Sequence, residues 1–215
     1  MKRKAFLFDA DGTIINSIED LRDAANYVLR TFGFPEHDTD AYRYFVGNGA
    51  RKLIERAFPA GTPAQILDQA YALYSAYYPE HSMDQTAPYP GVVEALTQLK
   101  AEGYRLAVIS NKPDNQTQLI IRALFDTDLF DLVTGKREEF PTKPDPALTF
   151  WVMEQLGLKA EECIFVGDSG VDMQTAKNCG ALAVGVTWGL RDREELVKNG
   201  ADQIVTTAKQ LLEIS

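Results

Sequence analysis

The chain has 215 residues, of which 45% are hydrophobic and 25% charged, a composition typical of folded globular domains that argues against disordered, collagen-like and coiled-coil classes. Thirty-one acidic and 22 basic residues give a net charge of −9, and this negative field disfavours nucleic acid as a partner. The apolar run behind the basic N-terminus ends after four residues at Asp9, and no run is long enough to span a membrane. We therefore expect a cytoplasmic protein without a membrane partner.

Short apolar segments followed by helical patterns recur along the chain, which is typical of βα units around a parallel sheet. Nearly all are apolar throughout, as expected for strands covered on both faces. The predicted strands are residues 5–9, 105–110, 132–134, 163–167, 183–187 and 203–205. Pro113 predicts a helix over 114–124, and Asp145 predicts a second one with Pro146 at its first position and Gly157 beyond its end. The predicted helices begin after the carboxyl ends of strands, where open α/β sheets bind ligands.

One long segment, residues 16–86, contains no strand pattern. Its apolar residues recur instead at helical spacing, as in Leu21, Ala24, Ala25, Val28 and Leu29. The segment leaves the fold directly after the first predicted strand. We therefore expect a helical insertion that lies over the carboxyl edge of the sheet.

Two acidic residues, Asp9 and Asp11, directly follow the first predicted strand. Gly12 and Thr13 come next, and the glycine permits a tight turn that leaves backbone N–H groups free. A pair of carboxylates can hold Mg²⁺ through oxygen ligands, and one of them could instead act as a nucleophile. The alternative, a solvated turn, is disfavoured by the position at the end of a buried strand.

Three further groups of polar residues follow at strand ends or in loops. Ser110 and Asn111 could donate hydrogen bonds to phosphate oxygens or cap a helix. Lys143, held extended by the following proline, could neutralise a phosphoryl group, although most lysines face solvent. Asp168 and Asp172 could complete a magnesium site or stabilise a helix N-terminus.

Taken in order, D-x-D-G-T at 9–13, Ser110, Lys143 and G-D-x-x-x-D at 167–172 resemble the four motifs of the haloacid dehalogenase superfamily of phosphohydrolases. The match spans essentially the whole chain, and the helical insertion is similar to the family's C1 cap. The resemblance implies a Rossmann-like α/β core with a parallel sheet, formed by residues 1–15 and 87–215, and a cap domain formed by residues 16–86. It also implies an enzyme, a Mg²⁺-dependent phosphatase that acts through an aspartyl-phosphate on a small phosphate ester.

The resemblance further implies a role for each matching residue. Asp9 would be the nucleophile and a metal ligand, Asp11 the general acid and base with its backbone carbonyl on the metal, and Asp168 the remaining metal ligand. Lys143 would be catalytic as well as phosphate-binding, and Asp172 would orient Lys143 or a metal-bound water. The implied phosphate-binding residues are Gly12, Thr13, Ser110, Asn111 and Lys143.

Within the superfamily, FVGNGARKL at 45–53, SNK at 110–112 and TWG at 187–189 resemble the phosphoglycolate phosphatase branch. A glycine-flanked loop that opens a helix offers N–H groups to an anion, and Arg51 or Lys52 could pair with a carboxylate. We therefore expect Gly47, Asn48, Gly49 and Arg51 to bind substrate, with a plain helix–helix turn as the alternative.

The predicted substrate is 2-phosphoglycolate. An inorganic pyrophosphatase and a phosphosugar mutase of the same superfamily remain alternatives, as does a phospho-accepting regulator without turnover, against which Asp11 argues. We expect a monomer or a homodimer.

Overall fold

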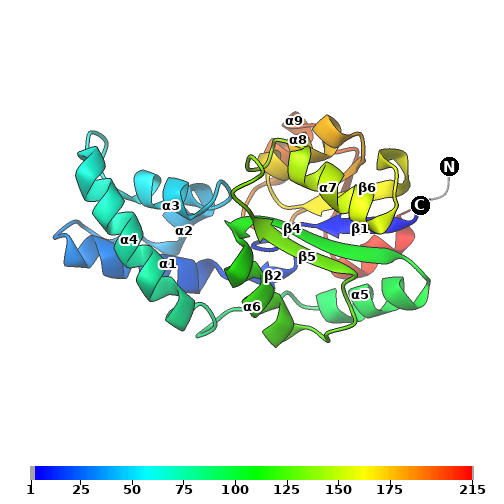
Figure 1. Cartoon of the computed structure of the whole chain (residues 1–215), viewed down its shortest axis with the longest axis horizontal. Coiled ribbons are helices and arrows are strands. Elements are labelled where there is room, and N and C mark those ends of the chain that lie inside the picture. Colours follow the sequence, from blue (N-terminus) through cyan, green and yellow to red (C-terminus); the bar gives the residue numbers. More distant parts are fainter. Residues whose placement is uncertain (1–2, 215) are drawn as a thin grey trace.

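The central sheet (Figure 1) consists of six parallel strands within residues 3–214. Their order is β5-β4-β1-β6-β7-β8. The structure is a computed structural model and describes residues 3–214. The strands are β1 (Ala5–Phe8), β4 (Arg105–Pro113), β5 (Leu132–Lys136), β6 (Cys163–Gly167), β7 (Leu182–Val186) and β8 (Gln203–Val205). Because β1 lies between β4 and β6, the residues that follow these three strands meet at one edge of the sheet.

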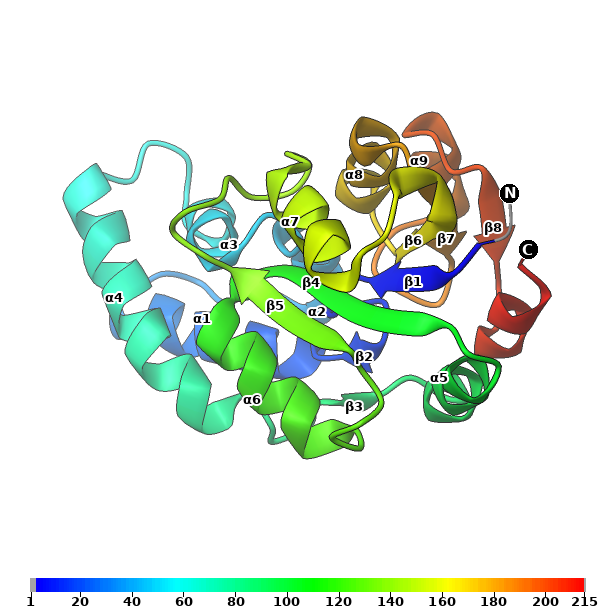
Figure 2. The ribbon, with the colours of Figure 1, turned by 45° about the vertical axis from the view of Figure 1, so that its right-hand side comes forward.

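Helices cover both faces of this sheet (Figure 2). One layer contains α5 (Val92–Ala101), α6 (Asp114–Leu124) and the 3₁₀-helix η2 (Ala208–Glu213). The other contains α7 (Ala147–Leu156), the 3₁₀-helix η1 (Ala160–Glu162), α8 (Gly170–Cys179) and α9 (Arg193–Lys198). In β1, Phe6 and Phe8 pack into the first layer and Ala5 and Leu7 into the second. This two-sided burial explains why the strand is apolar at every position.

Four helices beside the sheet form the cap: α1 (Ile18–Thr31), α2 (Thr39–Phe45), α3 (Ala50–Ala57) and α4 (Ala64–His81) (Figure 1). They share an apolar cluster separate from the two that lie on the two faces of the sheet, with Leu29, Tyr42, Ile54 and Ala70 among its buried members. The cap meets the carboxyl edge of the sheet, where the side-chain amide of Asn111 donates a hydrogen bond to the Gly47 carbonyl.

A short antiparallel ribbon joins the cap to the core. It pairs β2 (Ile15–Asn16) with β3 (Ala87–Pro88), so the chain enters and leaves the cap at the same place. The carboxylate of Asp20, at the start of α1, accepts hydrogen bonds from the backbone N–H groups of Gln85 and Thr86. These contacts fix the returning chain against the first cap helix.

The predicted α/β class with an inserted helical unit is confirmed, and all six predicted strands are present. Strand β4 continues to Pro113 instead of ending at 110, so Ser110, Asn111 and Lys112 lie in the strand and do not cap a helix. Helix α7 begins at Ala147, whose N–H donates to the carboxylate of Asp145. No helix within residues 3–214 is long and apolar enough to cross a membrane.

Candidate active site

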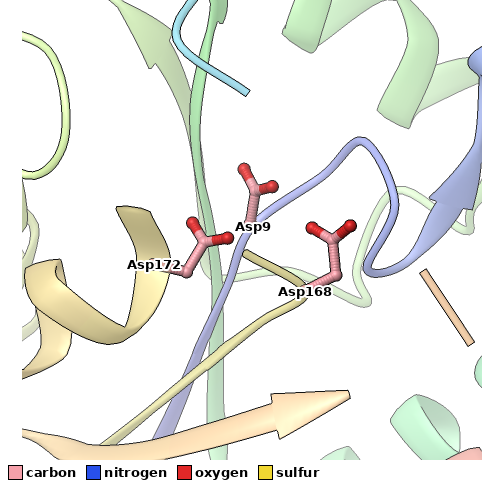
Figure 3. A group of neighbouring side chains, drawn as sticks. All are labelled: Asp9, Asp168 and Asp172. Carbon is pink, nitrogen blue, oxygen red and sulfur yellow. The ribbon is translucent and has the colours of Figure 1, made fainter. Parts of the chain in front are cut away.

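Three buried carboxylates converge at the carboxyl edge of the sheet (Figure 3). Asp9 directly follows β1, Asp168 directly follows β6, and Asp172 lies in the first turn of α8. One carboxylate oxygen from each residue lies within 4.8 Å of the other two. The parallel pairing of β1 with β6 brings the first two together, although 159 positions separate them in the sequence.

The ammonium of Lys143 bridges two of these carboxylates. Its Nζ lies 2.7 Å from Oδ1 of Asp9 and 2.7 Å from Oδ1 of Asp172. Lys143 lies in the loop after β5 and is itself buried. The second oxygen of Asp172 accepts hydrogen bonds from the backbone N–H and the hydroxyl of Ser169. Both oxygens of Asp172 are therefore engaged by the protein.

The site carries more negative than positive charge. Burial raises the pKa of Asp9 well above its usual value; Lys143 opposes this shift, while Asp172 and Asp168 add to it. Burial and the charge of Asp172 raise the pKa of Asp168 to about 7. Burial lowers the pKa of Lys143, but the adjacent Asp172 and Asp9 raise it by more, so this lysine stays charged. A divalent cation would relieve the excess of negative charge.

The donor set suits Mg²⁺. All three converging groups are carboxylates, and oxygen ligands are those that hard divalent cations prefer. Asp172 uses one oxygen for the Lys143 ammonium and the other for Ser169. Within residues 3–214, Asp168 accepts hydrogen bonds from neutral donors only and Asp9 contacts Lys143 through one oxygen, so these two are the better placed ligands. Asp168 is oriented by the backbone N–H of Leu190, which donates to its Oδ2 at 2.7 Å, and by the Thr13 hydroxyl at 3.3 Å from its Oδ1.

Gly12 brings the first loop against Asp168. Its φ is +87°, a conformation that favours glycine, and a Cβ added there would lie 2.2 Å from Oδ2 of Asp168. The carbonyl of the following Thr13 accepts a hydrogen bond from the indole N–H of Trp188 at 2.9 Å. The loops after β1, β6 and β7 therefore support one another around the carboxylates.

Asp11 lies beside the cluster with separate partners. The hydroxyl of Ser17 donates to its Oδ1, and Nζ of Lys112 lies 3.2 Å from its Oδ2. Lys112 is buried between Asp11 and the hydroxyl of Tyr78.

A cavity of about 290 Å³ opens between the core and the cap. The predicted residues that line it are Asp9, Asp11, Gly47, Gly49, Ser110 and Asn111. The apolar wall of the cavity includes Leu21, Val46 and Leu53, and the side chains of Tyr71, Tyr74 and Tyr78 line it from α4. The site therefore includes a semi-enclosed space next to Asp9.

Two of the predicted cap residues lie outside this lining. Arg51 pairs with Glu55 at 3.0 Å and with Asp68 at 2.6 Å. Asn48 accepts a hydrogen bond from the guanidinium of Arg56 at 2.7 Å. The structure thus joins both residues to other cap side chains, and of the four predicted cap residues it brings Gly47 and Gly49 to the cavity.

Several residues that organise the site were not singled out as site residues from the sequence. Ser169 is detectable, because Ser169-x-x-Asp172 fits the capping-box pattern at the start of α8. Leu190 acts through a backbone N–H, and no residue type identifies such a donor in a sequence. Lys112 is found only when its burial is known.

Comparisons with known proteins identify the family of the chain. The family model described as haloacid dehalogenase-like hydrolase matches residues 6–186. The phosphoglycolate phosphatase of Colwellia psychrerythraea is 34% identical and aligns with 98% of this chain and 96% of its own. That of Pseudomonas putida is 34% identical, with coverages of 96% and 77%. A solved structure of a predicted phosphoglycolate phosphatase from Haemophilus somnus is 30% identical, has a TM-score of 0.92 and covers 99% of this chain and 98% of its own.

This chain belongs to the haloacid dehalogenase-like hydrolase family. The predicted resemblance and the prediction of an enzyme of the hydrolase class are confirmed.

Proposed function

We propose that the protein is a Mg²⁺-dependent phosphatase that hydrolyses a small phosphate monoester, with 2-phosphoglycolate as its substrate. The observation that carries the proposal is the position of Asp9. Its carboxylate ends a central strand, contacts a buried ammonium and lines a cavity large enough for a small ester. The names of the relatives support a phosphoglycolate substrate.

In this mechanism a carboxylate oxygen of Asp9 attacks phosphorus, and the bond from phosphorus to the leaving oxygen breaks. Asp11 donates a proton to the leaving oxygen and later takes one from the water that hydrolyses the aspartyl-phosphate. Lys143 and Ser110 hold the phosphoryl oxygens. The backbone N–H groups of Gly12 and Thr13, expected from the sequence to be free, instead donate to the carbonyls of Ile15 and Ala10. Inorganic phosphate and the free alcohol are the products.

The metal would be held by Asp9, Asp168 and the backbone carbonyl of Asp11. When bound, Mg²⁺ would offset the charge of the carboxylates and of the phosphoryl group. Asp172 fixes the ammonium of Lys143 through its 2.7 Å contact, which keeps the lysine directed at Asp9.

A substrate panel with a nucleophile variant tests the proposal. We expect 2-phosphoglycolate to be hydrolysed with a higher kcat/KM than pyrophosphate or a hexose phosphate, and Asp9→Asn to abolish phosphate release from every ester, because an amide is a far poorer nucleophile. Asp126→Asn, in an exposed turn, is the matched control. A preference for pyrophosphate or a hexose phosphate by more than about tenfold, or about 1.4 kcal/mol, would contradict the substrate. Activity of the deamidation-checked Asp9→Asn protein would contradict the mechanism.

A further inference from the structure

One cation faces the cavity beside Asp9. Among the lining residues that the structure describes, Lys112 is the only lysine or arginine. It is 6% exposed, and its Nζ lies 2.7 Å from the Tyr78 hydroxyl and 3.2 Å from Oδ2 of Asp11. An ammonium carries three protons, and these two contacts account for two of them. The third is available to a ligand.

Two buried polar atoms at the same cavity lack partners. The Tyr74 hydroxyl belongs to a residue that is 2% exposed, and it forms no hydrogen bond within residues 3–214. The Oε1 of Gln116 is likewise buried and unpaired there, but as an acceptor it cannot pair with a carboxylate. Leaving a buried polar group unpaired costs about 1–3 kcal/mol, so such groups mark places where a ligand completes the hydrogen bonding. Both residues line the cavity that contains Asp9.

Tyr74 and Lys112 both line the cavity and both contact Tyr78. Tyr74 and Tyr78 are one helical turn apart on α4, and their rings stack with centroids 5.3 Å apart. The ring of Tyr78 in turn lies against Lys112, whose Nζ is 4.5 Å from the ring centroid. Burial raises the pKa of Tyr74 well above its usual value, so its hydroxyl remains a donor at neutral pH.

From this arrangement we propose that Lys112 and Tyr74 bind the carboxylate of the substrate, and that they, and not Arg51, give the enzyme its preference for a phosphorylated acid. This inference rests on the proposed phosphatase function. One ammonium proton and one phenolic hydroxyl match the two oxygens of a singly charged carboxylate. Apolar walls of Leu21, Val46 and Leu53 exclude water and strengthen the attraction.

The position of Lys112 also limits the length of the substrate. Lys112 contacts Asp11, the residue proposed to protonate the leaving oxygen. A carboxylate bound by Lys112 therefore lies only a short carbon chain away from that oxygen. The substrate class that follows is a phosphate ester of a short hydroxy acid, with the carboxylate one or two carbons from the ester oxygen.

The test compares two esters that differ at one end. 2-Phosphoglycolate carries a carboxylate where 2-hydroxyethyl phosphate carries a neutral alcohol. For the unmodified enzyme we expect kcat/KM to favour 2-phosphoglycolate by at least about tenfold. Tyr74→Phe should lower this ratio by about 10-fold and Lys112→Met by up to about 100-fold, the range for hydrogen bonds to charged groups. The loss should fall mainly on KM for 2-phosphoglycolate.

Matched variants separate recognition from general damage. Tyr71→Phe removes a hydroxyl from the same helix face, and Arg51→Ala removes the cap cation that pairs with Glu55 and Asp68. Both should retain the ratio. Because Lys112 also contacts Asp11, its replacement can slow the hydrolysis of both esters. The ratio of the two kcat/KM values is therefore the measure of carboxylate binding. Tyr74→Phe removes no hydrogen bond within residues 3–214, so we expect it to fold normally. It therefore tests the proposal even if Lys112→Met folds poorly.

Equal losses on the two esters in Tyr74→Phe and Lys112→Met would overturn the inference, as would a loss of the ratio in Arg51→Ala. Hydrolysis of p-nitrophenyl phosphate that requires Asp9 would in that case leave the phosphatase function standing. Failure of the unmodified enzyme to hydrolyse any of the three esters would overturn both.

Discussion

The side-chain amide of Asn111 forms two hydrogen bonds with the backbone of Lys143. Its Oδ1 accepts from the Lys143 N–H at 2.8 Å, and its Nδ2 donates to the Lys143 carbonyl at 3.2 Å. The same Nδ2 also donates to the carbonyl of Gly47 in the cap at 3.0 Å. Asn111 therefore fixes the loop that carries the buried lysine and connects it to the cap.

Asn111→Ala should lower kcat by about 10-fold or more, because the Lys143 ammonium loses the support that places it at Asp9, and small displacements of a catalytic group cost this much. Asn111→Asp keeps the acceptor for the Lys143 N–H but places a carboxylate oxygen against the carbonyls of Lys143 and Gly47, so it should not recover the loss. Steady-state kinetics with p-nitrophenyl phosphate measure both. Asn115→Ala, on the exposed side of α6 at the same cavity, is the control, and a similar loss there would argue against a specific role for Asn111.

Asp11→Asn should slow turnover by about 10² or more, the usual scale of general acid–base assistance. Single-turnover measurements with a poor leaving group and with p-nitrophenyl phosphate give a sharper result. The acid matters less when the leaving group needs no proton, so the rate of the first step should fall less for the nitrophenyl ester. Ser17→Ala removes only the hydroxyl that donates to Asp11 and should have a smaller effect. An unchanged rate in Asp11→Asn would move proton transfer to another group.

Chelation with EDTA should remove activity and added Mg²⁺ should restore it, because Asp9, Asp168 and a phosphate would otherwise place uncompensated negative charges together. Ca²⁺ should restore activity poorly, since its larger and looser coordination shell would misplace the nucleophile. Phosphate release after exhaustive dialysis measures the effect. Full activity without metal, or better activity with Ca²⁺, would refute this arrangement.

The metal-free protein should become less stable as the pH rises from about 4 through 7. Because the folded pKa of Asp168 is raised to about 7, the folded state holds a proton that the unfolded chain, with an ordinary aspartate near 3.9, has already released. The free energy of unfolding is therefore highest at a pH below the unfolded pKa. Between the unfolded and the folded pKa it falls by on the order of 1 kcal/mol per pH unit. Thermal unfolding between pH 4.5 and 8 measures this slope. Asp168→Asn should reduce this dependence of stability on pH. Stability that increases with pH over this range would contradict the raised pKa of Asp168.

Gly12→Ala should weaken Mg²⁺ activation at least about 10-fold, because the added methyl group would collide with Oδ2 of Asp168, which the carbon would approach to 2.2 Å. Gly33→Ala is the matched control. Gly33 has a similar φ of +75° but no atom within 4 Å of an added Cβ, so its replacement adds backbone strain alone. Titration of activity with Mg²⁺ distinguishes the two variants. Equal behaviour would show that strain, and not contact with Asp168, dominates.

The sheet and the insertion were predictable because they are periodic or apolar over many residues. The juxtaposition of Asp9 and Asp168 was also predictable in outline, since parallel strands end at one edge. The hydrogen-bond and ion-pair partners of individual polar side chains were not predictable in this way. The side chain of Asn111 can donate hydrogen bonds to a phosphate group, yet its amide binds the Lys143 backbone. For Arg51 a local signal existed, because Glu55 lies four residues further along the same helix and offers a partner.

The order of the strands in the sheet has a consequence for synthesis of the chain. Among the strands of residues 3–214, β1, which carries Asp9 at its end, pairs only with β4 and β6. Both follow the cap in the sequence, whereas the apolar cluster of the cap draws almost all of its residues from one continuous stretch. As the chain leaves the ribosome from its N-terminus, the cap helices can pack before β1 has either neighbour. The strand that bears the nucleophile is made before both of its neighbours, and it must wait for residue 167 before its place in the sheet is complete.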